Sequence, residues 1–221
     1  MNLASAFAAA AGEYPAKIAV FWGDEEHSYE RLFTQSRQLA AHLQHTLGVR
    51  PGDRVGLWLK NCPEFVPALF AVLASGAVVV PINNFLKPDE VHHVLADAGI
   101  DVIITDATMA EQFPALTALH PQIKFWQVEE FSRMENRSAA DFALHPSTRE
   151  DLAVIIYTSG TTGRSKGAML THGNLLHNVE SCRQVLAAVD HDRFVVLLPM
   201  FHSFMLCVGV LLPMIVGGSM A

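Results

Sequence analysis

The chain has 221 residues, of which 51% are hydrophobic and 17% charged, and it carries 15 Lys and Arg against 22 Asp and Glu. This length is enough for one large domain, or for one domain and part of another. The formal net charge of −7 excludes a general electrostatic attraction for nucleic acid, so any bound anion must be held by a local site.

Short runs of β-branched residues alternate along the chain with longer segments whose apolar residues recur at helical spacing. Strands are predicted at residues 18–22, 26–29, 54–59, 77–81, 101–105, 124–128, 152–157, 167–171 and 194–198, and helices at 29–46, 63–75, 88–98, 173–189 and after His202. Gly99 is the expected cap of the helix at 88–98. This alternation predicts an α/β fold with doubly wound, mostly parallel sheets flanked by helices.

Two apolar segments need a separate interpretation. Residues 1–12 have no Lys or Arg before Lys17, so they lack the basic start of a signal peptide and are predicted to form a short helix. Residues 194–216 contain no charged side chain and are long enough for a membrane span. Because Pro199, His202 and Pro213 interrupt them, a buried strand and a buried helix are predicted instead, with peripheral membrane contact left open.

The cysteines indicate the redox environment. Cys62, Cys182 and Cys207 are widely spaced, odd in number and form no CxxC pair. This pattern is typical of free thiols in a reducing cytoplasm and not of a disulfide framework or a metal site.

The predicted division of the chain falls at residue 150. Residues 1–150 are interpreted as part of a first α/β subdomain, ending in a polar surface connection at 133–149. Residues 151–221 would supply a strand, a glycine-rich loop, a helix and the start of a second subdomain. Because residue 221 follows directly on an apolar helix, we expect the chain to be the N-terminal part of a longer protein whose C-terminal domain is absent.

A glycine-rich loop carries the clearest chemical signal. It follows the buried strand at 152–157 and reads Thr158-Ser159-Gly160-Thr161-Thr162-Gly163-Arg164-Ser165-Lys166-Gly167. Glycines let backbone N–H groups approach an anion closely, hydroxyl groups donate further hydrogen bonds, and a lysine places a compact positive charge against phosphates. The alternative is a glycine-rich surface turn with a chance lysine, but so specific a string favours a nucleotide site.

The spacing differs from that of the common phosphate-binding loops. The Walker pattern is G-x-x-x-x-G-K-[ST], whereas Gly160 and Gly163 are three residues apart and Gly167 follows Lys166. The G-x-G-x-x-G dinucleotide pattern is also absent. An ordinary P-loop kinase or ATPase is therefore disfavoured.

Residues 157–167 resemble the signature of the adenylate-forming superfamily, which contains acyl-CoA synthetases, peptide-synthetase adenylation domains and firefly-type luciferases. Three further segments resemble this family in the same order: residues 27–32 (HSYERL), 73–83 (LASGAVVVPIN) and 198–204 (LPMFHSF). The resemblance covers nearly the whole chain. It implies the N-terminal part of an acyl-CoA synthetase-like fold.

The resemblance implies a two-step reaction. A carboxylate attacks the α-phosphate of ATP and expels pyrophosphate, and a thiol, usually that of coenzyme A, then displaces AMP. ATP, Mg²⁺ and coenzyme A are the implied cofactors and substrates, and a carboxylic acid is the implied small-molecule partner. A homo-oligomer is compatible with the sequence, which does not fix the oligomeric state.

The resemblance also assigns roles to single residues. Thr158, Ser159, Gly160, Thr161, Thr162, Gly163, Lys166 and Gly167 are expected to bind ATP through its β- and γ-phosphates, and Thr158 is expected to help hold Mg²⁺. His202 is expected to line the acyl pocket near the reacting carboxylate. A histidine in an apolar run is more often a packed core residue, which is the alternative for His202. Asn83 is expected to be structural.

The acyl substrate is indicated only by composition. The apolar residues after His202, together with residues 83–90 (NNFLKPDE), resemble fatty acyl-CoA synthetases and favour medium- or long-chain fatty acids. An aryl-acid or amino-acid adenylating enzyme is the first alternative, and a non-catalytic nucleotide- or partner-binding fragment is the second.

The 221-residue chain alone is predicted to be catalytically inactive. The family's adenine, ribose and acidic magnesium-binding residues and its C-terminal lysine are expected to lie beyond Ala221. ATP–pyrophosphate exchange at the rate of a complete ligase by this chain alone would contradict the prediction.

Overall fold

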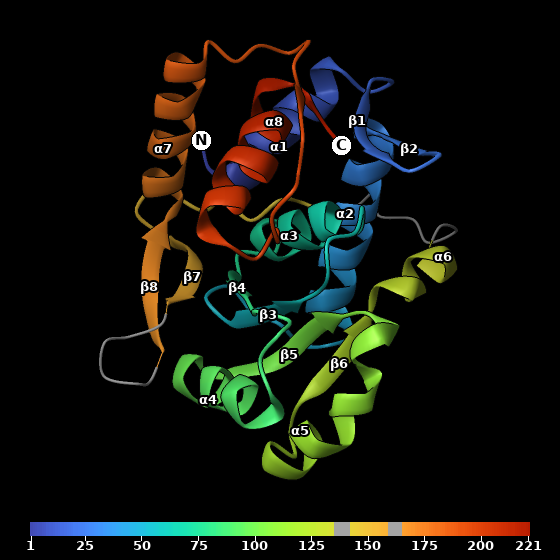
Figure 1. The fold of residues 1–221 in the computed structure, drawn as a ribbon, viewed down its shortest axis with the longest axis vertical. Helices are drawn as coiled ribbons and strands as arrows, with labels where there is room; N and C mark the ends of the chain where they lie inside the picture. Colours follow the sequence, from blue (N-terminus) through green and yellow to red (C-terminus); the bar gives the residue numbers. More distant parts are fainter. Residues whose placement is uncertain (135–141, 159–164) are drawn as a thin grey trace.

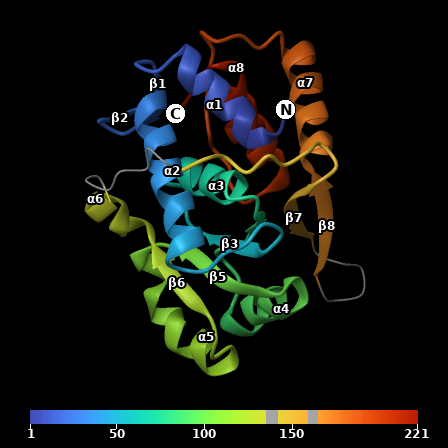
Figure 2. The ribbon, with the colours of Figure 1, turned by 180° about the vertical axis from the view of Figure 1, so that it is seen from behind.

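The chain folds around two β-sheets with helices between and around them (Figure 1). We describe residues 1–134, 142–158 and 165–221 of a computed structural model. The larger sheet has six strands and the smaller has four. Seen from behind, α2 (Tyr29–His45) and α3 (Phe65–Ala74) lie between the two sheets (Figure 2).

The six-stranded sheet is parallel except at one edge. Its strands are β3 (Arg54–Trp58), β4 (Val78–Pro81), β5 (Ile100–Thr105), β6 (Lys124–Gln127), β7 (Leu152–Thr158) and β8 (Lys166–Thr171). They lie in the order β6-β5-β3-β4-β7-β8. Only the β7–β8 pair is antiparallel, because a short loop joins these two strands and a parallel pair needs a longer crossover.

Each face of this sheet is covered by a separate hydrophobic core. Val79, Ile104 and Ile156 point into the core that also contains α1, α2 and α3. Their neighbours Val80 and Ile103 point into the second core, under α4 (Pro88–Ala98) and α5 (Phe113–Leu119). Since side chains alternate along a strand, a sheet buried on both faces needs apolar residues at consecutive positions, as the valine run of β4 provides.

The four-stranded sheet joins the two ends of the chain. Its strands are β1 (Ile18–Trp22), β2 (Glu25–Ser28), β9 (Arg193–Phe194) and β10 (Ser219–Met220), in the order β2-β1-β10-β9. β10 is parallel to both β1 and β9. The buried Tyr29 hydroxyl lies 2.9 Å from the Pro213 carbonyl oxygen and 2.8 Å from that of Gly218, and this contact joins α2 to the last helix.

The remaining helices pack around these sheets. They are α1 (Leu3–Glu13), α6 (Phe131–Met134), α7 (His172–Leu186), α8 (Leu212–Val216), the 3-10 helices at Ala107–Gln112 and Val128–Glu130, and a π-helix at Met205–Leu211. α1 packs against α8 as well as α2 and α3. It is therefore buried through most of its length, although it is short and rich in alanine.

The predicted fold class and most predicted elements are confirmed. The α/β architecture has mostly parallel sheets flanked by helices. α4 ends where the sequence predicts, because Gly99 takes the left-handed conformation at φ 66° that favours glycine. The division at residue 150 stays a prediction, and β7 pairs with β4 across it through Val79 and Val154.

Two parts of the prediction differ from the structure. The strand expected at 194–198 is wrong beyond Phe194, since β9 ends there and the side chains of Val195, Leu197 and Leu198 are exposed. After Val196 the segment that follows β9 separates from β10 and runs toward the end of β3. The helical segment at 107–119 was not predicted, because its only buried side chains are Met109 and Leu116 and no apolar stripe marks it.

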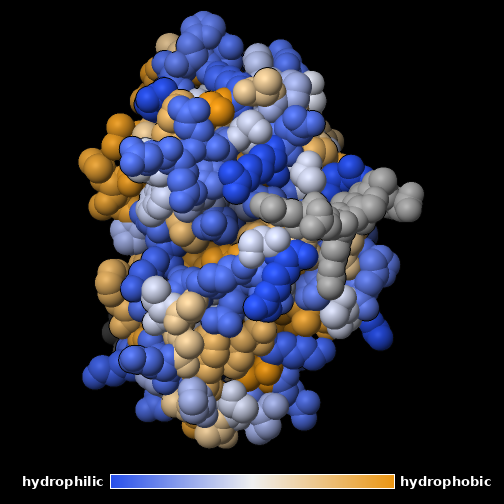
Figure 3. All heavy atoms as spheres, turned by 90° about the vertical axis from the view of Figure 1, so that its right-hand side faces the viewer, coloured by the Kyte–Doolittle hydropathy of each residue, from blue (hydrophilic) through white to orange (hydrophobic). Residues whose placement is uncertain are grey.

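The predictions of no membrane-spanning helix and of free thiols can be compared with the structure. Figure 3 shows one face on which hydrophilic residues mix with separate hydrophobic patches. No helix within residues 1–134, 142–158 and 165–221 is long and apolar enough to cross a membrane. All three cysteines are free, and burial raises the pKa of the Cys62 and Cys207 thiols, which keeps them protonated.

A buried histidine joins α1 to α7. The backbone N–H of Leu3, in the first turn of α1, donates to Nδ1 of His172 at 3.2 Å. A ring nitrogen that accepts a hydrogen bond carries no proton, so His172 is neutral in this arrangement. The side chain is buried, and this burial lowers the pKa of His172 to about 4.

This pKa predicts a pH-dependent stability. In the unfolded chain His172 takes up a proton near its ordinary pKa of about 6.5, whereas in the folded chain it does so only near 4. The unfolded state therefore binds more protons as pH falls from about 6.5 to 4, and the free energy of unfolding should fall by on the order of 3 kcal/mol. Urea denaturation at a series of pH values measures this.

The His172→Asn variant supplies an acceptor that does not titrate, so it should lose much of this pH dependence. The His177→Asn variant is the matched control on the exposed side of α7 and should behave as the wild type. Equal pH profiles for the wild type and H172N would contradict the assignment.

Candidate functional site

Polar side chains gather where the parallel strands of the six-stranded sheet end. Asn61 follows β3, Asn84 follows β4, Asp106 follows β5 and Thr158 ends β7. Since these strands are parallel, their carboxyl ends lie at one edge of the sheet. In open α/β sheets, ligands bind in the crevice outside this edge.

The described ends of the glycine-rich loop lie opposite each other in this region. Thr158, the last residue of β7, and Lys166, the first of β8, are paired across the antiparallel ladder. Directly paired residues project from the same face of a sheet, so the Thr158 hydroxyl and the Lys166 ammonium group share one face. Both residues are exposed. The predicted phosphate-binding residues Ser159, Gly160, Thr161, Thr162 and Gly163 lie outside the described residues.

The opposite face of this hairpin is held by α4. The Tyr157 hydroxyl donates to Oδ2 of Asp97 at 2.5 Å, and Nε2 of His93 lies 3.2 Å from the Ser165 carbonyl oxygen. Burial, followed by the hydrogen bond to Asp97, raises the pKa of Tyr157. One helix thus contacts the chain on both sides of the loop. Because Tyr157 points toward α4, the adjacent Thr158 points away from it.

Gly167 is needed for close packing. A Cβ atom at this position would lie 2.6 Å from Cγ2 of Ile155 and 3.3 Å from Cζ of Tyr157. These two side chains flank Gly167 on the face of the hairpin toward α4. The resemblance assigns Gly167 to phosphate binding, which stays a prediction. The structure shows that Gly167 is also needed for packing against Ile155 and Tyr157.

A methyl group at Gly167 should therefore destabilise the protein. We expect the Gly167→Ala variant to lose about 1–3 kcal/mol of unfolding free energy, because Ile155 must move away from an overpacked site. The control is Gly12→Ala, at an exposed position in α1 with nothing within 4 Å of the added Cβ. It should gain up to about 1 kcal/mol from the better helix propensity of alanine. Thermal denaturation compares the two, and equal melting temperatures would contradict the expectation.

His202 is exposed and not part of the core, which contradicts the alternative of a packed core histidine. The residue closes a turn in which its backbone N–H donates to the Pro199 carbonyl at 3.0 Å. Its own carbonyl accepts from Leu206 at 2.8 Å, and the π-helix follows. Unusual helices of this kind are frequent at functional sites.

The side chain of Asn61 attaches this segment to the chain just after β3. Nδ2 of Asn61 donates to the Leu198 carbonyl at 2.9 Å, and Oδ1 of Asn61 accepts from the Met200 N–H at 2.8 Å. The ring of Phe201 also contacts that of Phe85, with centroids 6.3 Å apart. The turn before His202 is therefore held at the carboxyl edge of the six-stranded sheet.

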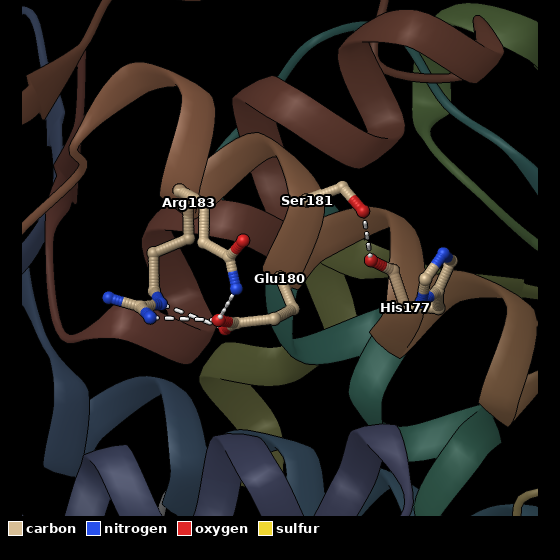
Figure 4. Close-up of polar contacts among 5 residues, drawn as sticks. His177, Glu180, Ser181 and Arg183 are labelled. Atoms are coloured by element: carbon tan, nitrogen blue, oxygen red, sulfur yellow. Dashed lines mark hydrogen bonds and ion pairs between the residues drawn. The ribbon is translucent and has the colours of Figure 1, made fainter.

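A cavity of about 580 Å³ lies at the C-terminal end of α7, away from the loop. Its lining includes Leu176, Ile215, Glu180 and Arg183. Glu180 accepts hydrogen bonds from Arg183 (Figure 4) and from Gln184, and these bonds lower the pKa of the Glu180 carboxyl to about 2. Glu180 and Arg183 form an ion pair at its rim, and Arg149 and Asp190 also line the cavity.

A model of the AMP-binding enzyme family matches residues 7–221. The chain belongs to this family. It is 33% identical over 232 residues to a long-chain-fatty-acid–CoA ligase of Escherichia coli O6:H1, covering 88% of this chain and 41% of the relative. It is 37% identical over 209 residues to a feruloyl-CoA synthase of Amycolatopsis sp, covering 93% of this chain and 40% of that relative.

A solved structure confirms the fold. The inhibitor-bound N-terminal domain of FACL13 from Mycobacterium tuberculosis superposes with a TM-score of 0.91 at 29% identity, covering 99% of this chain and 56% of that one. The chain therefore corresponds to a part of the N-terminal domain in the acid–CoA ligases of the AMP-binding family. It spans about two fifths of the length of the two curated relatives.

The sequence prediction missed Asn61, Asp97 and His93. Asn61 stands in the run Lys60-Asn61-Cys62 just after a predicted strand, a position that points to the carboxyl edge of a sheet. Asp97 and His93 are four residues apart and so lie on one face of the predicted helix. Only the tertiary structure shows what these side chains contact.

Proposed function

We propose that the protein takes part in ATP-dependent activation of a carboxylic acid, first to an acyl-adenylate and then to a coenzyme A thioester. The observation that carries the proposal is the pairing of Thr158 with Lys166 at the end of β7, on either side of the glycine-rich loop. ATP and coenzyme A are substrates of this ligase family. This chain spans about two fifths of the length of the two curated relatives, so the activity of the whole protein is a proposal.

The two ends of the hairpin suit the charge of a triphosphate. Pyrophosphate leaves as a highly charged group, so the reaction depends on positioning and on neutralising that charge. Lys166 would contribute a positive charge, and the proposed phosphate ligands Ser159 to Gly163 would contribute hydrogen bonds. Lys166 is exposed and pairs with no acidic side chain among the described residues, so its ammonium group can reach a ligand.

We assign Thr158 a part in binding Mg²⁺. A hydroxyl is an oxygen donor of the kind Mg²⁺ prefers, and this ion usually binds through few protein groups together with substrate phosphates. Thr158 is exposed at the end of β7, which fits this role. No cluster of His, Cys, Asp or Glu within residues 1–134, 142–158 and 165–221 forms a metal site by itself. The ion would offset negative charge on the phosphates.

The Lys166→Met variant tests the nucleotide site. Losing one charge-assisted hydrogen bond should cost about 1.5–3 kcal/mol, a tenfold or greater loss of ATP affinity. The matched control is Lys124→Met, on β6 at the far edge of the same sheet, which should bind ATP as the wild type does. Calorimetric titration with ATP measures both. Equal affinities for wild type and K166M would remove the phosphate role of Lys166.

We further propose medium- or long-chain fatty acids as the substrates. His202 would line the acid site, and the apolar residues that follow it would line the acyl pocket. The 33% identity to a long-chain-fatty-acid–CoA ligase supports this choice. The 37% identity to a feruloyl-CoA synthase supports the second candidate, an aryl acid.

A panel of acids distinguishes the two substrate classes. ATP–pyrophosphate exchange by the intact protein should respond to dodecanoate and hexadecanoate and not to ferulate or benzoate. The opposite response would replace the fatty acid by the aryl acid and leave the adenylation proposal in place. A failure of all four acids to support exchange would contradict both substrate proposals.

A further inference from the structure

Asn61 makes a two-point contact with a distant segment that contains the proposed acid-binding residue. Its side-chain amide donates to Leu198 and accepts from Met200, at 2.9 and 2.8 Å. These bonded groups flank Pro199, which has no N–H to offer. An asparagine side chain presents the same donor and acceptor as a peptide group, so Asn61 pairs with this segment as a neighbouring strand would.

The segment needs such a partner because it has left the sheet. Val196 is the last residue there with a sheet-like bond, from its N–H to the Ala221 carbonyl at 2.8 Å. The side chains of Leu197 and Leu198 are 83% and 48% exposed, so core packing does not fix them. Met200 is 2% exposed. The segment is therefore buried again at the residue whose N–H donates to Asn61.

The contact is transmitted to His202 through the backbone. The N–H of His202 donates to the Pro199 carbonyl, between the two groups that Asn61 binds. Leu206 then donates to the His202 carbonyl at the start of the π-helix. A shift of Pro199 therefore moves the His202 backbone directly.

Asn61 itself is fixed by the sheet. It stands three residues after the end of β3, the strand between β5 and β4. The neighbouring Lys60 N–H lies 3.3 Å from Oδ2 of Asp106, and the Leu59 carbonyl lies 3.4 Å from Nδ2 of Asn84. Its position is thus set by the same strand ends that form the proposed ligand crevice.

We propose that Asn61 is a positioning residue for the acid substrate, holding the turn at Pro199 so that His202 faces the carboxyl edge of the sheet. This inference rests on the proposed function, because it assigns His202 to the acid site. Asn61 need not touch the substrate. A displacement of about 1 Å in a positioning group can cost up to about a hundredfold in rate.

The test compares Asn61→Ala with Asn178→Ala in the intact protein. Asn178 is exposed on α7, away from the carboxyl edge of the six-stranded sheet, so it is the matched control. Two quantities are measured: hydrogen exchange of the Met200 amide, and the KM for dodecanoate and for ATP in pyrophosphate exchange. We expect N61A to exchange the Met200 amide about tenfold faster and to raise the KM for the acid about tenfold. The KM for ATP should change less than twofold.

A second variant separates positioning from general loss of structure. Asn61→Asp nearly preserves the shape and keeps an acceptor for Met200, but at pH 8 it faces the Leu198 carbonyl with an oxygen in place of a donor. It should protect the Met200 amide better than N61A and still raise the KM for the acid. Its melting temperature should stay within a few degrees of that of the wild type.

Each outcome decides the matter. An unchanged Met200 amide in N61A, or an equal rise in the KM values for acid and ATP, overturns the positioning role while leaving the proposed function intact. A wild-type protein with no acid-dependent exchange overturns the proposed function, and the role in acid binding with it. The same effects in N178A would also overturn the specific role of Asn61.

Discussion

The parallel pairing of β4 with β7 is the contact on which the arrangement of this molecule depends. Val79 pairs with Val154, and this register places the end of β7 beside the end of β4. Thr158 then lies at the same edge as the segments that follow β3, β4 and β5. This pairing is the hydrogen-bonded link between the β7–β8 hairpin and the other four strands of the sheet.

Polar contacts outside the ladders complete the arrangement. Asp97 and His93 of α4 contact residues on either side of the glycine-rich loop. Asn61 contacts residues on either side of Pro199. In the first case a helix holds the residues that flank the loop, and in the second a residue just after β3 holds a segment that has left the sheet. The proposed phosphate and acid sites are therefore supported by α4 and by the segment after β3, both of which adjoin the six-stranded sheet.

The sequence predicts the parts of this fold whose local pattern and tertiary role agree. The valine run of β4 predicts a strand buried on both faces, and Gly99 predicts the end of α4. The pattern fails where tertiary contacts decide. Residues 195–198 are as apolar as a buried strand, but beyond Val196 their partner is the Asn61 side chain and not a strand. Residues 107–119 form helices with few buried side chains, so they show no amphipathic stripe.

The same distinction applies to the site. Thr158 and Lys166 could be named from the loop string, since their residue types and spacing carry the chemistry. Asn61 could not, because its partners are 137 and 139 residues away and both of its bonds are to main-chain groups. Main-chain groups exist at every residue, so no sequence pattern identifies which of them a side chain contacts.

The smaller sheet has a consequence for synthesis on the ribosome. Val20 of β1 pairs with Met220 of β10, whereas the last strand of the larger sheet ends at Thr171. The six strands of the larger sheet can assemble while the chain is still being translated, but β1 must wait for a partner made much later. Pairings between residues so far apart in the chain form slowly. The exposed β1–β2 hairpin is thus the part of the nascent chain that a chaperone would need to shield for longest.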